Sequence, residues 1–285
     1  MDIIHKRTLE ENIFKGLMLF SLSVVIGSLI IIIGLVIING ASSLSIEMIT
    51  QTSSGGYYLG KGGGVLNAIV GSLLLALPAT LFAYLIGLGI SLFLQKDLTH
   101  PKISSFIRLT LDILWGIPSI IYGIFCLIFM ILIGIGTSLI AGIIALTLLE
   151  LPIITRYMDE SIKMVPMGLR ESAYSLGSTK FETSVKIVRR QALPGIIAGV
   201  LLGLGRGIGD AASILFTAGF SDRIPQSLND ATAALPTMIY HLYASPIPLV
   251  RQRAYAAAFL LLIIVLTISI LSRFCTKKCT KFVIR

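Results

Sequence analysis

The chain has 285 residues, of which 55% are hydrophobic and 13% are charged, and its formal net charge is +9 at pH 7. Soluble globular domains carry about 25% charged residues, and the mean hydropathy here is +0.92. The composition therefore excludes a soluble globular domain and predicts an integral membrane protein.

Apolar runs long enough to cross a bilayer recur along the chain. A transmembrane helix needs about 20 predominantly apolar residues. Six runs meet this length, at about 14–38, 66–94, 106–133, 137–157, 194–219 and 254–272. We therefore expect an all-α polytopic membrane protein with six transmembrane helices. An even number of spans places both termini on the same side of the membrane.

The Lys and Arg residues indicate how these spans are oriented. With a cytoplasmic N-terminus, the inner segments hold 18 of the 23 basic residues and the outer segments hold four, while Arg206 lies within a span. Cytoplasmic loops are enriched in Lys and Arg, so we expect a multi-pass protein of the cytoplasmic (inner) membrane with both termini in the cytoplasm. A basic inner face opposite anionic membrane lipid also explains the net charge without a nucleic-acid partner.

Two short motifs resemble ligand sites without meeting their requirements. In the outer loop at 39–65, the stretch 55–62 is close to a phosphate-binding P-loop, but Gly62 stands where that motif needs a Ser or Thr to hold magnesium. In the basic tail, Cys275 and Cys279 have no further Cys or His nearby to complete a zinc site. We therefore expect neither a nucleotide nor a metal to bind this chain.

Charged residues near the inner ends of spans three and four are expected to pair locally. Arg108 and Asp112 stand four residues apart, which places them on one face of a helix. Glu150 lies near the inner boundary of span four, and Arg156 is close enough in sequence to be its partner. The spacing therefore predicts two interfacial ion pairs, one within each span.

Residues 156–192 form the longest inner segment. Met158–Met164 and Gly168–Val188 are rich in helix-forming residues, and Pro166 lies between them, so we expect two short helices joined by a turn.

Within the second of these helices, Ala173, Leu176 and Phe181 fall near one another at helical spacing, and charged residues dominate elsewhere. This amphipathic pattern is typical of a helix that lies in the groove of a partner protein. On periodicity alone, a helix lying flat on the membrane fits nearly as well.

Span five contains a stripe of small residues. Glycines recur every four residues, a pattern that lets another helix approach closely. These glycines are Gly195, Gly199, Gly203 and Gly207.

Four polar residues in span five are the candidates for a substrate pathway. If the helix continues, Arg206 and Asp210 lie within about 60° of Gly203, and Ser213 and Thr217 within about 80°. A charge at mid-membrane costs at least about 2.5–3.5 kcal/mol on insertion scales, which favours a functional role. We predict that these four residues line the pathway. An Arg206–Asp210 pair that only stabilises the bundle is the alternative.

Two proline-containing segments are expected to shape the bundle. The segment Trp115-Gly-Ile-Pro118 predicts a kink in span three, which fits either ordinary packing or a hinge. The outer segment Phe220–Val250 combines apolar residues with prolines and predicts a partly buried re-entrant or surface helix, where a delivered substrate would arrive.

Several segments together resemble a known family. Glu171-Ser-Ala-x3-Gly177 is similar to the coupling loop by which ABC-importer permeases dock to their ATP-binding subunits. Together with that loop, five further segments, in this order along roughly 65–250, resemble the phosphate-import permeases of the PstA type. They are Ile120-Ile-Tyr122-Gly, Gly177-Ser-Thr-Lys-Phe181, Ala192-Leu-Pro-Gly-Ile196, Leu215-Phe-Thr-Ala218-Gly and Leu235-Pro-Thr-Met-Ile-Tyr240.

The resemblance implies a type I ABC importer that works by alternating access, in which this chain is a transmembrane subunit and not an enzyme. Its partners would be a second homologous permease, two ATP-binding subunits that hold the ATP and Mg, and an extracytoplasmic phosphate-binding protein. The substrate would be inorganic phosphate. The residues implied in docking to the ATPase are Glu171, Ala173, Leu176, Gly177, Lys180 and Phe181.

The chain also departs from this family. Arg189-Arg190 replaces a Leu-Pro pair after the coupling glycine, and Asp210-Ala-Ala-Ser213 replaces Glu-Thr-Ala-Pro in span five. Loss of the proline predicts a straighter fifth helix. The change also makes another oxyanion, such as molybdate, tungstate or a phosphonate, an alternative substrate.

The same features organise the chain into three parts. Residues 1–65 hold the N-terminal tail, the first span and the outer loop, 66–273 form the permease domain with the coupling loop at about 156–192, and 274–285 form a basic cytoplasmic tail. An ion-coupled secondary transporter is the less favoured alternative, because we find no convincing internal inverted repeat. A membrane scaffold without transport would leave the charges of span five without a use.

Overall fold

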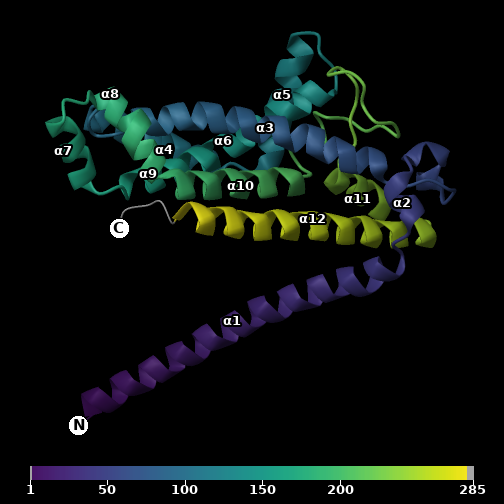
Figure 1. Ribbon diagram of the computed structural model, residues 1–285. Helices are drawn as coiled ribbons and strands as arrows, with labels where there is room; N and C mark the ends of the chain where they lie inside the picture. The colour runs from purple at the N-terminus through teal and green to yellow at the C-terminus, as the bar shows by residue number, and fades with distance from the viewer. Residues whose placement is uncertain (1, 281–285) are drawn as a thin grey trace.

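The computed structural model describes residues 2–280, and every regular element in this range is a helix (Figure 1). Four helices are long and apolar enough to cross a membrane on their own. They are α1 (Asp2–Ser42), α3 (Leu66–Phe93), α6 (Leu139–Lys163) and α12 (Pro248–Thr280). The all-α prediction is confirmed.

Spans three and five are each bent pairs of helices. α4 (Pro101–Gly116) and α5 (Ser119–Leu132) meet at 98°, and the segment from α8 to α9 meets α10 (Leu193–Gly209) at 71°. The first bend falls at the predicted kink, where Pro118 cannot supply a backbone N–H to continue α4. The described residues therefore contain four to six spans, and six only if each bent pair counts as one.

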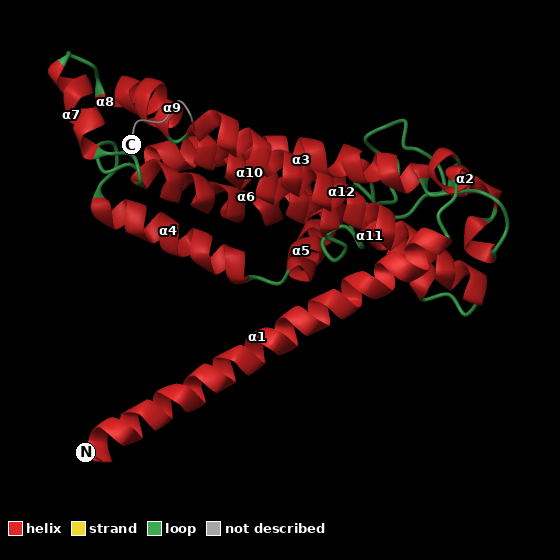
Figure 2. Ribbon diagram, turned by 60° about the horizontal axis from the view of Figure 1, so that its bottom comes forward, coloured by secondary structure: helices red, strands yellow, loops and turns green. Residues whose placement is uncertain are grey.

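The core of the molecule lies between four helices. α3 and α6 lie side by side, α10 packs against both, and α12 packs against α10 (Figures 1 and 2). Leu75, Leu146 and Ile154 are among the largest side chains that are fully buried there. These helices hold the fifth span in place from two sides.

Helix α1 departs from this body along most of its length (Figure 2). It contacts α12 only near its end, where Gly40 lies against Tyr255 and Phe259. Apolar side chains such as Phe20 and Ile38 are exposed around the rest of the helix. A helix that is apolar on all sides suits lipid or another transmembrane helix.

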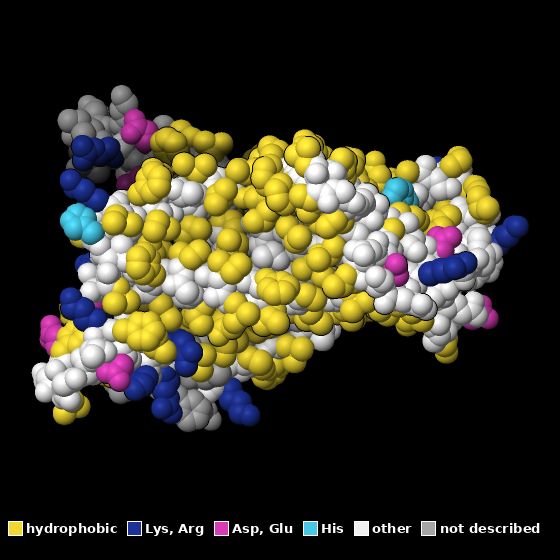
Figure 3. Space-filling model, turned by 90° about the horizontal axis from the view of Figure 1, so that it is seen from above, with side chains coloured by type: hydrophobic (Ala, Val, Ile, Leu, Met, Phe, Trp, Pro, Cys, Tyr) yellow, Lys and Arg dark blue, Asp and Glu magenta, His cyan; other side chains and the backbone are white. Residues whose placement is uncertain are grey.

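The two ends of the bundle differ. One carries the C-terminal end of α12 and the segment with α7 (Met167–Ser175), α8 (Lys180–Glu182), the π-helical turn Thr183–Val188 and α9 (Arg189–Gln191). The other carries α2 (Ile46–Thr50), the short turns Ser53–Gly55 and Tyr57–Leu59, and α11 (Leu235–Tyr243). Figure 3 shows apolar side chains over the middle of one face, with most of its Lys and Arg side chains at the α7 end.

The outer segment contains the partly buried helix that the sequence predicts. α11 buries Leu235, Met238 and Leu242 and packs against α12 and α3. The amide of Leu235 donates to the Ser72 hydroxyl of α3 at 2.8 Å. The preceding residues 210–234 are turns and loops.

Two ion pairs near the α7 end join α4 to α6. Arg108 of α4 pairs with Asp159 of α6 at 2.8 Å, and Asp112 of α4 pairs with Arg156 of α6 at 2.7 Å. The predicted Arg108–Asp112 pair is therefore wrong. Residues at i and i+4 do share a face, but here that face meets a second helix whose opposite charges lie closer.

Candidate functional site

The glycine stripe of α10 lies directly against α6. A Cβ at Gly195, Gly199 or Gly203 would collide with Ser161, Tyr157 or Ile154, and one at Gly207 would collide with the Glu150 carboxyl. As the residue numbers of the glycines rise along α10, those of the facing residues on α6 fall. The two helices therefore pack antiparallel along the whole stripe. Only glycine permits this close approach.

Helix α10 ends at Gly209, ten residues before the predicted end of span five. Asp210 has extended backbone angles of φ −80° and ψ 124°, and residues 212–218 form turns. Arg206, Asp210, Ser213 and Thr217 therefore do not share one helix face, and the prediction of a continuous fifth helix to residue 219 is wrong. Six glycines in α10 weaken its intrinsic helix propensity, since each costs about 1 kcal/mol relative to alanine.

Asp210 turns the chain after α10 instead of pairing with Arg206. Its Oδ2 accepts the backbone N–H of Ser213 at 2.8 Å and the Ser213 hydroxyl at 2.5 Å. The Thr217 hydroxyl in turn donates to the Ser213 carbonyl at 2.9 Å. Ser213 and Thr217 are fully buried. These groups satisfy one another inside the protein, so their hydroxyl protons are not directed at the cavity.

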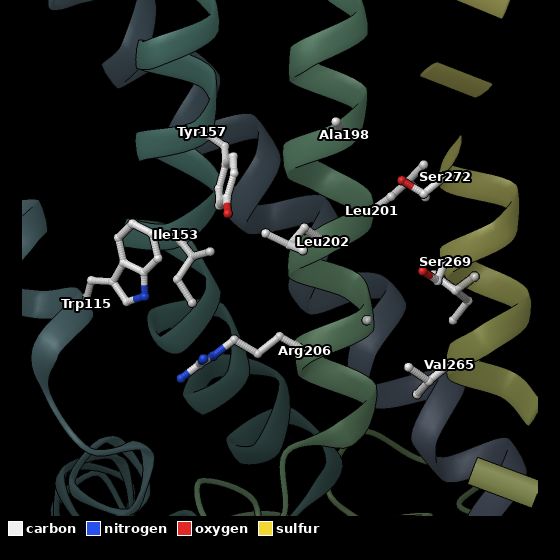
Figure 4. Close-up of a pocket in the computed structure, with 12 residues that line it drawn as sticks. Trp115, Ile153, Tyr157, Ala198, Leu201, Leu202, Arg206, Val265, Ser269 and Ser272 are labelled. Atoms are coloured by element: carbon white, nitrogen blue, oxygen red, sulfur yellow. The ribbon is translucent and has the colours of Figure 1, made fainter. Parts of the chain in front are cut away.

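Arg206 lies at a cavity of about 490 Å³ between α10, α6, α4 and α12. Its side chain is exposed, and no hydrogen bond or ion pair joins its guanidinium to another described residue. Figure 4 shows it extending from α10 toward the side on which Trp115 and Ile153 lie. The rest of the lining is Tyr157, Ala198, Leu201, Leu202, Gly205, Val265, Ile268, Ser269 and Ser272.

The polar part of this lining was missed by sequence reasoning. Tyr157, Ser269, Ser272 and Trp115 line the same cavity as Arg206, with Trp115 on the side toward which the guanidinium extends and the two serines on α12 (Figure 4). They come from α4, α6 and α12, so no local spacing in the sequence relates them to Arg206. The one available signal is that Trp115 is the only tryptophan of the chain and adjoins the predicted kink.

Glu150 is fully buried, and neither of its carboxyl oxygens has a hydrogen-bond partner among the residues that the structure describes. It faces Gly203 and Gly207 of α10. Its predicted pairing with Arg156 is wrong, because six residues along a helix correspond to about 120° of rotation. Arg156 pairs instead with Asp112, Asp159 and Glu160.

The predicted coupling loop folds as two helical segments with a sharp turn at Gly177. α7 ends before it, and Gly177 has a φ of +83°, a left-handed conformation that favours glycine. The chain restarts at α8, where Thr179 and Glu182 cap each other's backbone N–H. Hydrogen bonds from Thr179 and the Lys186 ammonium lower the pKa of Glu182.

The loop exposes two large apolar side chains at its tip. Leu176 is 88% exposed and Phe181 is 68% exposed, whereas Ala173 is buried. Ala173, Leu176 and Phe181 therefore do not form one helix face, because the turn at Gly177 separates them. Met164 and Met167 are also exposed. Glu171 and Lys180 are exposed charged residues of the same loop.

Comparisons with known proteins give the class. Residues 87–279 match the family described as binding-protein-dependent transport system inner membrane component. The fold is similar to the methionine ABC transporter MetNI in an inward-facing form, with a TM-score of 0.63 at 21% identity over 76% of this chain and 96% of that one. The fold is thus that of an ABC transporter membrane subunit.

Curated relatives agree with this class. The chain is 33% identical to the phosphate transport system permease protein PstA of Haemophilus influenzae over 94% of both chains. It is 38% identical to PstA of Mycobacterium leprae over 73% of this chain and 69% of that one. It is 32% identical to the probable ABC transporter permease protein YqgI of Bacillus subtilis over 75% of this chain and 72% of that one.

The chain belongs to the family of inner-membrane components of binding-protein-dependent transport systems. It is therefore a multi-pass protein of the inner membrane and the permease component of an ABC importer. Such a component is not itself catalytic, because ATP is bound by separate ATPase subunits. Membership also implies an ATPase and a binding protein as its partners.

Proposed function

We propose that this chain is the permease subunit of an ATP-driven importer of inorganic phosphate. The relatives named PstA, which match over most of the chain, support this substrate. The observation that carries the proposal is Arg206, which lines a cavity between helices of the bundle and has no hydrogen bond or ion pair with another described residue. A guanidinium stays ionised and matches the geometry of phosphate oxygens.

The neighbouring polar residues are proposed to act differently from Arg206. Asp210 holds the turn after α10 through Ser213, and its negative charge near the cavity keeps phosphate from binding too tightly to leave. Thr217 stabilises the same turn. Tyr157, Ser269 and Ser272 supply hydroxyls that can meet the oxyanion along the cavity.

The coupling loop is proposed to carry the motion of the ATPase into the membrane. Leu176 and Phe181 supply the apolar contact with an ATP-binding subunit, while Glu171 and Lys180 supply charges around it. Ala173 packs the loop onto the permease, and Gly177 sets its turn. ATP binding would push this loop and switch the permease between inward-open and outward-open states.

The assembly is proposed to contain a second homologous permease, two ATP-binding subunits and an extracytoplasmic phosphate-binding protein. Both termini face the cytoplasm. Residues 66–273 form the permease domain, residues 1–65 add the first span and an outer loop, and 274–285 form an inner-leaflet tail. The charge distribution along the sequence supports this orientation.

Uptake by a reconstituted complex tests the role of Arg206. Replacement by Ala should abolish ATP-dependent uptake of labelled phosphate in liposomes, while Arg206→Lys should retain part of it because the charge remains. Arg223→Ala removes an exposed Arg from the outer loop and serves as the control. Co-purification of the ATPase subunits reports assembly. Normal uptake by an assembled Arg206→Ala complex would exclude Arg206 from the pathway.

A related oxyanion is the second candidate, favoured by the unusual Asp210-Ala-Ala-Ser213 segment after α10. Competition of unlabelled anions with the uptake of labelled phosphate distinguishes the two candidate substrates. Arsenate should reduce uptake of labelled phosphate, whereas sulfate, molybdate, tungstate and phosphonates should not. Transport of one of these anions in preference to phosphate would replace the proposed substrate.

A further inference from the structure

The coupling helix α7 is fastened to the loop that follows α3 by a buried guanidinium. Arg170 has a side chain only 7% exposed and pairs with Asp97 at 3.1 Å. Its second terminal nitrogen donates to the Gln95 side chain at 2.8 Å and to the Ile162 carbonyl at 3.3 Å. The Tyr174 hydroxyl also donates to Asp97, at 2.8 Å. The Asp97 carboxylate therefore accepts hydrogen bonds from two side chains of α7.

This fastening is part of the folded protein and not a flexible surface contact. Asp97 is 16% exposed, and Gln95 is buried, with its amide donating to the Ser91 carbonyl at 2.8 Å. Burial and the hydrogen bond to Asp97 raise the pKa of Tyr174. Exposed ion pairs contribute little, but breaking a buried one leaves an uncompensated charge.

The same loop is attached to α4. Arg108 donates to the Leu94 carbonyl at 2.9 Å and pairs with the fully buried Asp159 of α6. One turn further along α4, Asp112 pairs with Arg156. These two pairs cross between α4 and α6 in opposite senses, so each helix contributes one cation and one anion. These contacts hold α4 both to α6 and to the loop at 94–99, which binds α7 through Asp97.

The far end of α4 reaches the cavity. Trp115 lies three residues beyond Asp112 and lines the cavity beside Arg206 (Figure 4). The 98° break between α4 and α5 follows at once. A displacement of the loop at 94–99 would therefore be carried along α4 to a side chain at the proposed pathway.

We propose that Arg170 and Asp97 form the mechanical link through which movement of the coupling helix reaches α4 and Trp115. The inference rests on the proposed role of the coupling loop, and Asp97 acts as a positioning residue. Without the Asp97 carboxylate, α7 remains joined to α6 through the turn at 164–166 and the Arg170–Ile162 hydrogen bond, and its contact with the loop at 94–99 is weakened. ATP hydrolysis would then continue without moving the cavity wall.

The test uses the complete complex with its ATPase subunits and binding protein in liposomes. Asp97→Asn should lower the phosphate transported per ATP hydrolysed by about tenfold, the range of a typical coupling energy, while ATPase activity changes by less than about twofold. Lys96→Gln is the matched control, because it removes an exposed charge from the same loop. Its coupling ratio should equal that of the unaltered complex.

A second readout does not depend on the substrate. Trp115 is the only tryptophan of this chain, so the difference between the unaltered and Trp115→Phe complexes isolates its fluorescence. ATP should change that signal in the unaltered and Lys96→Gln complexes, and the change should be lost with Asp97→Asn. Failure of the unaltered complex to transport phosphate would count against the proposed substrate alone, since this signal requires only ATP.

Two outcomes would overturn the link. One is an assembled Asp97→Asn complex with a normal coupling ratio and a normal Trp115 signal. The other applies if that variant does not assemble: Tyr174→Phe removes only a hydroxyl that donates to Asp97 and should still lower the coupling ratio by about threefold. Normal coupling in Tyr174→Phe would then show that α7 acts through its connection to α6.

Discussion

At the residue scale, the contact between Gly207 and Glu150 decides how closely α10 and α6 can pack. The Glu150 carboxyl occupies the place that a Cβ on Gly207 would need. Gly205, two residues away on the same helix, has nothing within 4 Å of its Cβ position. One helix thus offers a glycine that packing requires and another that packing does not.

Replacement of Gly207 by Ala should destabilise the protein by about 1–3 kcal/mol, because the new Cβ overpacks the contact and the buried Glu150 carboxyl would have to shift. Gly205→Ala should be neutral or stabilising by up to about 1 kcal/mol, because alanine has the higher helix propensity. Thermal unfolding of the detergent-solubilised protein measures both. Equal stability of the two variants would contradict the role assigned to the stripe.

The residue scale also shows what local spacing cannot predict. The four-residue repeat of glycines correctly indicated a close-packing face, because packing along one helix follows its own period. The pairings predicted for Arg108, Asp112 and Arg156 are wrong, because each of these side chains pairs with a residue of the facing helix. Which helices face each other is a property of the tertiary fold and leaves no trace in i, i+4 spacing.

At the element scale, the coupling loop depends on the backbone conformation of one residue. Gly177 adopts a φ of +83°, and its Cβ position is open to solvent. Backbone strain, and not lack of space within this chain, therefore limits which residues can replace Gly177. A left-handed conformation costs a residue other than glycine about 1–2 kcal/mol, and Asn tolerates it best.

Gly177→Val should distort the turn between α7 and α8 and reduce ATP-driven uptake by at least about fivefold, a loss within the range of typical coupling energies. Gly177→Asn should retain most of the uptake, although its side chain is about as large. Uptake and ATPase co-purification are measured for both variants. Similar losses in the two would show that size at the ATPase contact, and not backbone strain, is limiting.

The element scale is also where continuity of helices was misjudged. Hydrophobicity located the fifth span but could not place its end, because residues 211–219 remain mostly apolar after α10 has stopped. The end follows from Asp210, whose carboxylate binds the Ser213 backbone. An Asp three residues before a Ser is too common a pattern to predict such a turn by itself.

At the scale of the whole molecule, composition and the length of the apolar runs predicted the fold class and the positions of the long helices. An all-α bundle needs only apolar length, and its long helices lie where that length predicts them. The cavity at Arg206 needed the structure, because its wall combines side chains from four helices. The sequence motifs identified the family, while the geometry of its proposed pathway depended on tertiary packing.

Orientation is the remaining whole-molecule prediction, and the thiols of the chain can test it. Cys126 is buried and Cys275 is exposed near the end of α12. If both termini are cytoplasmic, a membrane-impermeant thiol reagent should label the native chain only after the membrane is permeabilised. Asn229→Cys places a thiol in the exposed loop at the opposite end of the bundle and should add labelling from outside intact cells. Labelling of the native chain in intact cells, with no increase for Asn229→Cys, would reverse the orientation and place the coupling loop on the wrong side for an ATPase.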